Sequence, residues 1–181
     1  MGVTKVKVCG ITELEDARLA VGLGAWAIGL ILWADSPRAA SREAAEEIGA
    51  ALRRQLEVVG VFVNAPLDEV ALAADRFGLT MLQLHGDEGP AYCREAARRT
   101  GAKVMKAARV KDAASVRDLG AFRTDFHLLD AHAPGRPGGT GVSSRRVAFR
   151  SSHGSNALQG ESPPSARRAT TSSSLARVTA T

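Results

Sequence analysis

The chain has 181 residues, of which 45% are hydrophobic and 24% charged, a balance that suits about one globular domain and excludes a wholly disordered or collagen-like chain. No apolar run reaches the roughly 18 residues of a membrane helix, and the first residues lack the apolar stretch of a secretory signal. Two cysteines make neither a disulfide framework nor a zinc site, so we expect a cytoplasmic protein. The whole net charge of +5 lies in residues 142–181, because residues 1–141 are electrically neutral.

The first elements alternate short apolar runs with helical patterns. A β-branched run in KVKVCG, at 6–9, predicts a strand. Thr12 and Glu15 then form a capping-box pattern, which predicts the start of a helix at this point. The continuous apolar run at 26–33 is typical of a strand covered on both faces. Ser41 opens the second predicted helix, with acidic residues near its positive end.

The same alternation continues to residue 130. Six β–α repeats of about 20–25 residues demand right-handed crossovers and a parallel sheet. Two α/β architectures fit, an open doubly wound sheet or most of an eight-stranded barrel. The turn after the first strand lacks the G-x-G-x-x-G spacing of a dinucleotide-binding sheet. The later predicted strands are 58–63, 81–85, 103–108 and 126–130, and the helices between them begin at Pro66, Pro90 and Asp112.

Polar residues at the C-terminal ends of the predicted strands are the candidates for chemistry. Cys9, His85 and Asp130 end the first, fourth and sixth strands, and Arg38 lies in the loop after the second. In a β/α barrel these ends converge on the face that holds the active site. A thiol, an imidazole, a carboxylate and a guanidinium at one mouth indicate acid–base chemistry on a charged substrate. Each residue alone also has a structural interpretation: a buried thiol, a hydrogen bond to a carbonyl, a turn cap or a solvated charge.

A series of motifs in fixed order resembles one known family. KVCGIT at 7–12, followed by EDA at 15–17, is similar to the opening of phosphoribosylanthranilate isomerases, which act in tryptophan biosynthesis. The resemblance covers almost all of residues 5–141 and implies an eight-stranded (β/α)8 barrel of the TIM type, of which this chain carries about six β/α units. The further motifs are GLILWADSPR (29–38), VGVFVN (59–64), LQLHG (82–86), KAARV (106–110), LLDA (128–131) and PGGTG (137–141).

The resemblance implies an aldose–ketose isomerase that converts N-(5-phosphoribosyl)anthranilate to 1-(2-carboxyphenylamino)-1-deoxyribulose 5-phosphate. It makes Cys9 the general base and Asp130 the general acid. It places Arg38 against the anthranilate carboxylate and His85 in the lining of the substrate site, while Cys93 matches nothing catalytic and is assigned a structural role. It implies no metal and no organic cofactor, and its partner is a small phosphosugar substrate rather than nucleic acid or a membrane.

The resemblance stops directly after Gly141. The family continues with two further β–α units whose glycine-rich turns hold the substrate phosphate, whereas residues 142–181 are rich in Ser, Arg, Ala and Pro. One explanation is an out-of-frame reading of a gene rich in G and C, which we favour because the change falls inside a motif. The others are a disordered extension and a basic arm that binds nucleic acid, although Phe149 is its single aromatic residue.

We therefore divide the chain into an incomplete barrel domain, 1–141, and a disordered, poorly packed tail, 142–181, with no strand longer than 147–149. The first and sixth strands become open edges, which invite aggregation. We expect Cys9 and Asp130 to face each other across one mouth of the sheet. We also expect little isomerase activity, and the alternative function is a non-catalytic barrel fragment or a partner-binding remnant.

Overall fold

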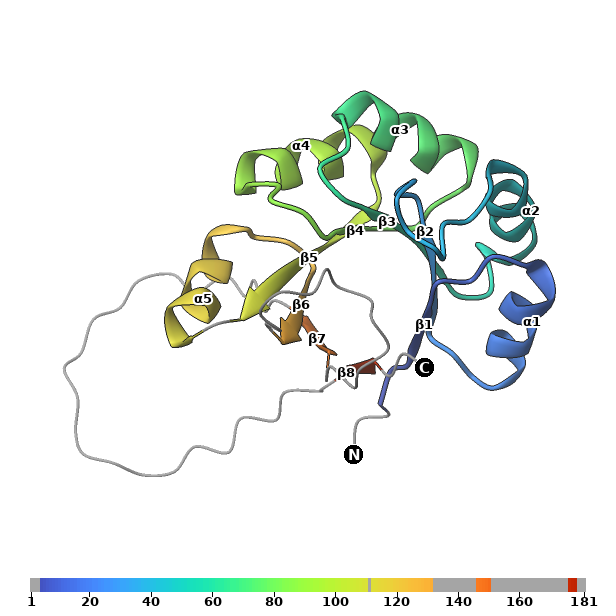
Figure 1. The fold of residues 1–181 in the computed structure, drawn as a ribbon, viewed down its shortest axis with the longest axis horizontal. Coiled ribbons are helices and arrows are strands. Elements are labelled where there is room, and N and C mark those ends of the chain that lie inside the picture. Colours follow the sequence, from blue (N-terminus) through green and yellow to red (C-terminus); the bar gives the residue numbers. More distant parts are fainter. Residues whose placement is uncertain (1–3, 111, 132–145, 151–175, 179–181) are drawn as a thin grey trace.

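The structure, a computed structural model, describes residues 4–110, 112–131, 146–150 and 176–178. Six parallel strands, each paired with the next along the chain, curl into a half-barrel, and the helices lie on its outer side (Figure 1). This is the barrel-type α/β fold expected from the sequence, and it excludes the doubly wound sheet. The parallel strands are β1 (Lys7–Cys9), β2 (Ala27–Ile31), β3 (Glu57–Phe62), β4 (Met81–Leu84), β5 (Lys103–Val110) and β6 (Phe126–Ala131).

Each connection between these strands carries a helix, as right-handed β–α–β crossovers require. The helices are α1 (Leu14–Gly22), α2 (Arg42–Leu52), α3 (Leu67–Arg76), α4 (Pro90–Thr100) and α5 (Ala113–Asp118), the last followed by a 3-10 turn, η1 (Leu119–Ala121). Their ends follow local chemistry. The Ser41 hydroxyl accepts a hydrogen bond of 3.1 Å from the Ala44 N–H at the start of α2. Helix α4 begins at Pro90 and ends at Thr100, and the C-cap residue Gly101 has a φ of 66°, which suits glycine.

The predicted capping box at the start of α1 is wrong. The helix begins at Leu14, its N-cap residue is Glu13, and no side chain caps it. The cause lies in the preceding turn, where the N–H groups of Gly10 and Ile11 both donate to the Gly29 carbonyl, at 2.9 and 3.1 Å. Both bonds belong to the turn after β1, in which Gly10 has a φ of +88°, and the helix starts one residue later than the Thr12 pattern predicts.

Apolar side chains cover both faces of the curved sheet. The larger cluster lies between the sheet and the helices and includes Cys93, which is fully buried on α4. The smaller cluster contains strand residues without any helical partner, so it marks the concave face. Its members are Ala27, Val59, Met81, Met105, Ala107, Phe126 and Leu128, with Trp26 packed against them.

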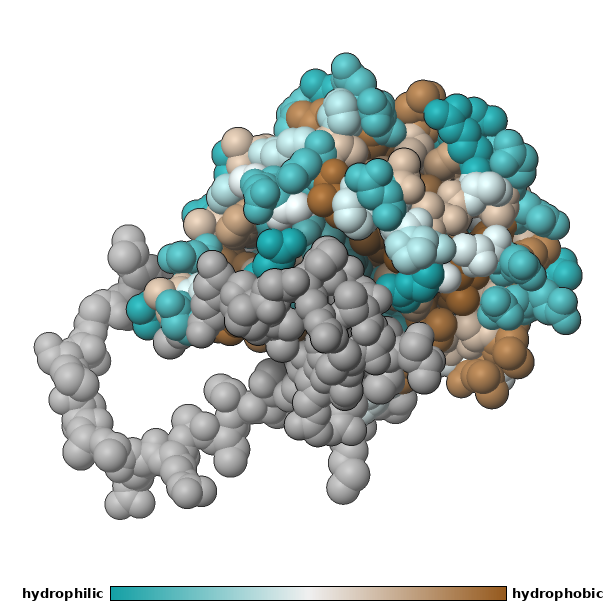
Figure 2. Space-filling view, in the orientation of Figure 1, coloured by the Kyte–Doolittle hydropathy of each residue, from teal (hydrophilic) through white to brown (hydrophobic). Residues whose placement is uncertain are grey.

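The outer surface is largely hydrophilic over the helices, as Figure 2 shows. An apolar group lies over α1, where the side chains of Leu19 and Leu23 are 61% and 80% exposed. None of the helices in the described part of the chain is long and apolar enough to cross a membrane.

Two strands from the last 40 residues extend the sheet. Strand β7 (Arg146–Arg150) pairs antiparallel with β6, and β8 (Ala176–Val178) pairs antiparallel with β7 and lies beside β1 (Figure 1). The prediction that β6 is an open edge is therefore wrong, and β7 is longer than the expected 147–149. The physical reason is that unpaired N–H and C=O groups on a sheet edge accept any extended segment that returns to them. The rest of the predicted tail, and the glycine-rich motif at 137–141, lie outside the described residues.

Candidate active site

The candidate residues come from three different connections of the half-barrel. Cys9 is the last residue of β1, His85 directly follows β4, and Asp130 is the penultimate residue of β6. Arg38 lies in the loop between β2 and α2. All four therefore lie at the C-terminal ends of the strands, where the side chains of a β/α barrel meet.

Asp130 and His85 contact each other. The distance between His85 Nε2 and Asp130 Oδ2 is 3.3 Å, and the two side chains are only 17% and 8% exposed. They come from β6 and from the end of β4, so the contact passes over the intervening strand β5. A carboxylate in this position is held by a neighbouring ring nitrogen and is largely shielded from water.

Gln83 fixes the His85 ring from the other side. Its amide Nε2 lies 2.9 Å from His85 Nδ1. An amide nitrogen can only donate, so Nδ1 is the acceptor and the ring proton of neutral His85 lies on Nε2. This tautomer donates to Asp130. The Gln83 carbonyl oxygen is buried without a hydrogen-bond partner. The amide orientation that satisfies His85 therefore leaves one buried acceptor unsatisfied, which costs free energy.

Arg38 lies against the end of β1. Its Nη1 donates a hydrogen bond of 3.3 Å to the backbone carbonyl of Cys9. Gly10 makes this approach possible, because a Cβ at that position would lie 2.9 Å from the same nitrogen, and its φ of +88° also favours glycine. The structure thus forms two pairs, Asp130 with His85 and Arg38 with Cys9.

The side chains of Lys7 and Cys9 lie together beside β2. A Cβ on Gly29 would lie 2.6 Å from Lys7 Nζ and 2.7 Å from Cys9 Sγ. Gly29 pairs with Cys9 in the sheet, and its lack of a side chain leaves the room that both groups occupy. Sequence interpretation missed Lys7, although its spacing of two residues from Cys9 on one strand already placed both side chains on the same face.

A second lysine, Lys106, forms a buried ion pair that organises the loops at this end of the sheet. Its ammonium lies 2.9 Å from Glu88 Oε2, with the two side chains 5% and 1% exposed, and also donates to the carbonyls of Leu84 and Gly86. Glu88 in turn accepts from the backbone N–H groups of Asn64 and Gly86. The pair ties the loops after β3 and β4 together. A lysine inside the apolar run KVMKAA was the signal for it in the sequence.

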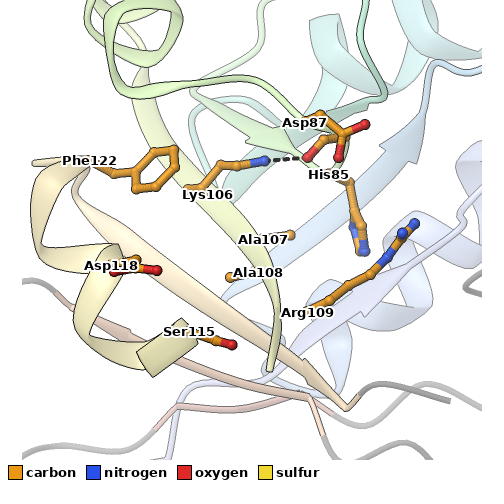
Figure 3. Close-up of a pocket in the computed structure, with 10 residues that line it drawn as sticks. His85, Asp87, Lys106, Ala107, Ala108, Arg109, Ser115, Asp118 and Phe122 are labelled. Atoms are coloured by element: carbon orange, nitrogen blue, oxygen red, sulfur yellow. Dashed lines mark hydrogen bonds between the residues drawn. The ribbon is translucent and has the colours of Figure 1, made fainter. Parts of the chain in front are cut away.

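A cavity of about 420 Å³ opens beside His85. It lies between the ends of β4 and β5 and helix α5, and Figure 3 shows two of its lining residues, His85 and Arg109, extending toward one another. Lys106 and Phe122 also line it, together with the acidic residues Asp87 and Asp118, so its walls carry charges of both signs beside an aromatic ring.

Cys93 differs from Cys9 in its surroundings. Burial among apolar side chains raises the pKa of the Cys93 thiol to about 11, whereas Cys9 is partly exposed. A neutral, fully buried thiol on α4 is consistent with the structural role assigned to Cys93. Within the described part of the chain no three His, Cys, Asp or Glu side chains gather where a metal ion could bind.

Comparisons with known proteins agree with this architecture. A family model described as N-(5'phosphoribosyl)anthranilate (PRA) isomerase matches residues 6–150. The chain belongs to this family. It is 50% identical over 138 residues to the N-(5'-phosphoribosyl)anthranilate isomerase of Citrifermentans bemidjiense, a match that covers 76% of this chain and 65% of that protein. The chain therefore spans just under two thirds of the length of that relative.

Solved structures of the same family share the fold. The phosphoribosylanthranilate isomerase of Thermotoga maritima matches with a TM-score of 0.68 and 36% identity, over 74% of this chain and 64% of that one. The enzyme from Thermus thermophilus matches with a TM-score of 0.64 and 38% identity, over 73% and 64% of the two chains. A further isomerase structure, in complex with reduced 1-(o-carboxyphenylamino)-1-deoxyribulose 5-phosphate, matches with a TM-score of 0.66 and 37% identity, over 72% and 66%.

Proposed function

We propose that the chain carries the acid–base centre of a phosphoribosylanthranilate isomerase of tryptophan biosynthesis. The observation that carries the proposal is the contact between Asp130 and His85 at the C-terminal end of the half-barrel, within the segment that the family model matches. Cys9 at the end of β1 supplies the second group. The activity is that of the family, an aldose–ketose isomerisation without change of composition.

The reaction needs one acid and one base. In its acid form, Asp130 gives a proton to the furanose ring oxygen of N-(5-phosphoribosyl)anthranilate, and the ring opens to a Schiff base. Cys9, as a thiolate, then takes the proton from C2′ of the sugar to give an enolamine. This enolamine tautomerises to the aminoketone product, 1-(2-carboxyphenylamino)-1-deoxyribulose 5-phosphate. No step calls for a metal or an organic cofactor.

The binding roles follow from charge. We assign Arg38 to the anthranilate carboxylate, because a guanidinium fork matches a carboxylate, and His85 to the lining of the site. The buried contact between His85 and Asp130 supports a role close to the proton donor. We further propose a cytoplasmic setting, where Cys9 stays reduced, and a phosphosugar rather than nucleic acid as the partner.

The binding of the substrate phosphate is the function for which this sequence lacks the family's groups. The family holds the phosphate with glycine-rich turns after its seventh and eighth strands, and the sequence from 142 onward has no such turns. Strand β7 runs antiparallel to β6, which differs from the parallel order of a complete barrel. We therefore expect a turnover far below that of a complete relative, since phosphate binding helps to orient the reacting sugar.

A direct assay tests the proposal. The 181-residue chain is purified beside a version in which residues 142–181 are replaced by the C-terminal third of a relative, and loss of the anthranilate-type fluorescence of the substrate is followed. We expect the replaced version to turn over and the natural chain to do so weakly. Cys9→Ala and Asp130→Asn in the replaced version should each abolish turnover, and unchanged turnover in either variant would contradict the assigned roles.

The alternative is a non-catalytic barrel fragment or a partner-binding remnant. The observation that favours it is the antiparallel pairing of β7 with β6, because the strands of a complete β/α barrel are parallel. Complementation of a tryptophan auxotroph separates the two functions, since growth requires turnover. DNA binding that weakens with salt and disappears on deletion of 142–181 would instead support a nucleic-acid arm.

A further inference from the structure

Lys7 is a charged side chain in an almost fully buried position. It lies on β1 with 2% of its surface exposed. Burying an ammonium is costly unless an anion or several hydrogen bonds compensate it. Lys106, the comparable buried lysine, has both a carboxylate and two carbonyl oxygens within hydrogen-bond distance.

Lys7 has no such carboxylate. Among the described residues, no Asp or Glu oxygen lies within 4.0 Å of its ammonium. We therefore looked for another group near Lys7 that can carry a negative charge. The thiol of Cys9 is the titratable group that shares its strand face, two residues away, and lies against the same glycine.

Gly29 brings the two groups together. Lys7 Nζ and Cys9 Sγ both lie within 2.7 Å of the point that a Cβ on Gly29 would occupy. The pairing register explains this, because Cys9 and Gly29 are direct neighbours across β1 and β2. Any side chain at position 29 would push the ammonium and the sulfur away from their present positions.

We propose that the Lys7 ammonium is the counter-ion of a Cys9 thiolate, so that the base is held in its charged form before substrate arrives. Lys7 is then a positioning residue that acts through Cys9. The inference rests on the proposed function only in naming Cys9 as the base. A nearby cation is a general way of holding a cysteine as the reactive thiolate.

The other charged groups near Cys9 come from three directions. From the loop after β2, Arg38 donates to the Cys9 carbonyl and adds a second cation. Strand β2 contributes Gly29, which carries no charge. From β6 and the end of β4, Asp130 and His85 form their own contact with each other. Lys7 differs from these groups because its Nζ lies next to Gly29, in the space that Cys9 Sγ also occupies.

The pH dependence of alkylation tests the pairing in the full chain. Iodoacetamide is added over a range of pH, and the Cys9 and Cys93 peptides are quantified by mass spectrometry. Cys93 is the internal control, since its burial raises its pKa to about 11. We expect the Cys9 midpoint to fall at least about one pH unit below the ordinary thiol value of roughly 8.5. A midpoint at or above the ordinary value overturns the proposal without any substitution.

Two variants then assign the effect to Lys7. Lys7→Met removes the charge and keeps most of the volume, and we expect it to raise the Cys9 midpoint by about one unit and to slow alkylation about tenfold at pH 7. Lys7→Arg keeps a cation and should retain most of the shift. A Lys7→Met midpoint equal to that of the parent overturns the proposal.

Neither the alkylation profile nor the comparison of variants depends on turnover. A low Cys9 midpoint in an inactive chain would therefore retain this inference and count against the proposed function.

Discussion

Gln83 determines which nitrogen of His85 carries the proton. It therefore also determines whether Asp130 faces an N–H group or an unprotonated nitrogen. The Gln83 amide donates to His85 Nδ1, which leaves the proton on Nε2, the nitrogen that contacts Asp130. We predict that Gln83→Leu frees the ring to adopt the other tautomer. The imidazole ¹⁵N shifts of His85 should move from the Nε2–H pattern toward a mixture.

Gln55→Leu is the matched control, because Gln55 is an exposed glutamine in the turn after α2, and its side chain donates to the Ala51 carbonyl. The His85 spectrum should be unchanged in this variant. An unchanged spectrum in Gln83→Leu as well would show that Asp130 alone orients the ring.

Residues at strand ends could be predicted from the sequence, and residues inside strands could not. Cys9, His85 and Asp130 stand out because a polar residue follows an apolar run, and family motifs surround each of them. Lys7 and Gln83 occupy positions within strands, where a polar residue gives no indication of what it contacts. The groups beside them, Cys9 and His85, lie two residues further along the same strand face, but the sequence alone does not show that these side chains come close to one another.

At the scale of elements, the buried pair of Lys106 and Glu88 links β5 to the loops after β3 and β4. Removing one partner leaves the other as an uncompensated buried charge. We predict that Glu88→Gln lowers the free energy of unfolding by about 3–5 kcal/mol. Urea unfolding followed by tryptophan fluorescence measures it.

The double variant provides the control. Glu88→Gln combined with Lys106→Met removes both charges, and its loss of stability should be clearly smaller than the sum of the two single losses. Additive losses would mean that the two charges do not depend on each other.

Helix packing gives a second prediction at this scale. A Cβ on Gly49 of α2 would lie 1.8 Å from the backbone carbonyl oxygen of Phe77, at the end of α3. Backbone cannot move aside as a side chain can, so we predict that Gly49→Ala lowers the free energy of unfolding by about 3 kcal/mol or more. The measurement is again urea unfolding.

Gly22 is the matched position for this test. It is a helical glycine, at the end of α1, and nothing lies within 4 Å of the position of an added Cβ. Gly22→Ala should leave stability unchanged or raise it by about 0.5 kcal/mol, because alanine favours the helix. Equal effects of the two substitutions would contradict the packing argument.

The order of the elements could be predicted better than their ends. Alternating apolar runs and helical patterns predict six strands with a helix in each connection between them, because burial imposes a period on the sequence. The start of α1 could not be predicted, since hydrogen bonds from the Gly10 and Ile11 N–H groups to Gly29 set it. The predicted length of β7 is too short for a similar reason. Its length depends on how far it pairs with the edge of β6, which its own composition does not specify.

At the scale of the whole molecule, β7 and β8 occupy the space between the two ends of the half-barrel. Strand β7 pairs with β6 over four residue pairs, and β8 lies beside β1. The net gain from such pairing is small, because about 1 kcal/mol for each hydrogen bond is offset by the cost of ordering the segment. The main consequence is that the edge of β6 is covered, which limits association between chains.

We predict that a chain ending at Gly141 aggregates at lower protein concentration than the full chain, because deletion of residues 142–181 removes β7 and β8 and exposes the edges of β6 and β1. Light scattering against concentration measures this. A chain ending at residue 150 is the control: it keeps β7 on the edge of β6, so its scattering should stay closer to that of the full chain. Equal scattering by the chains ending at 141 and 150 would show that β7 does not protect the edge, and aggregation would then have to come from the concave face that both truncated chains share.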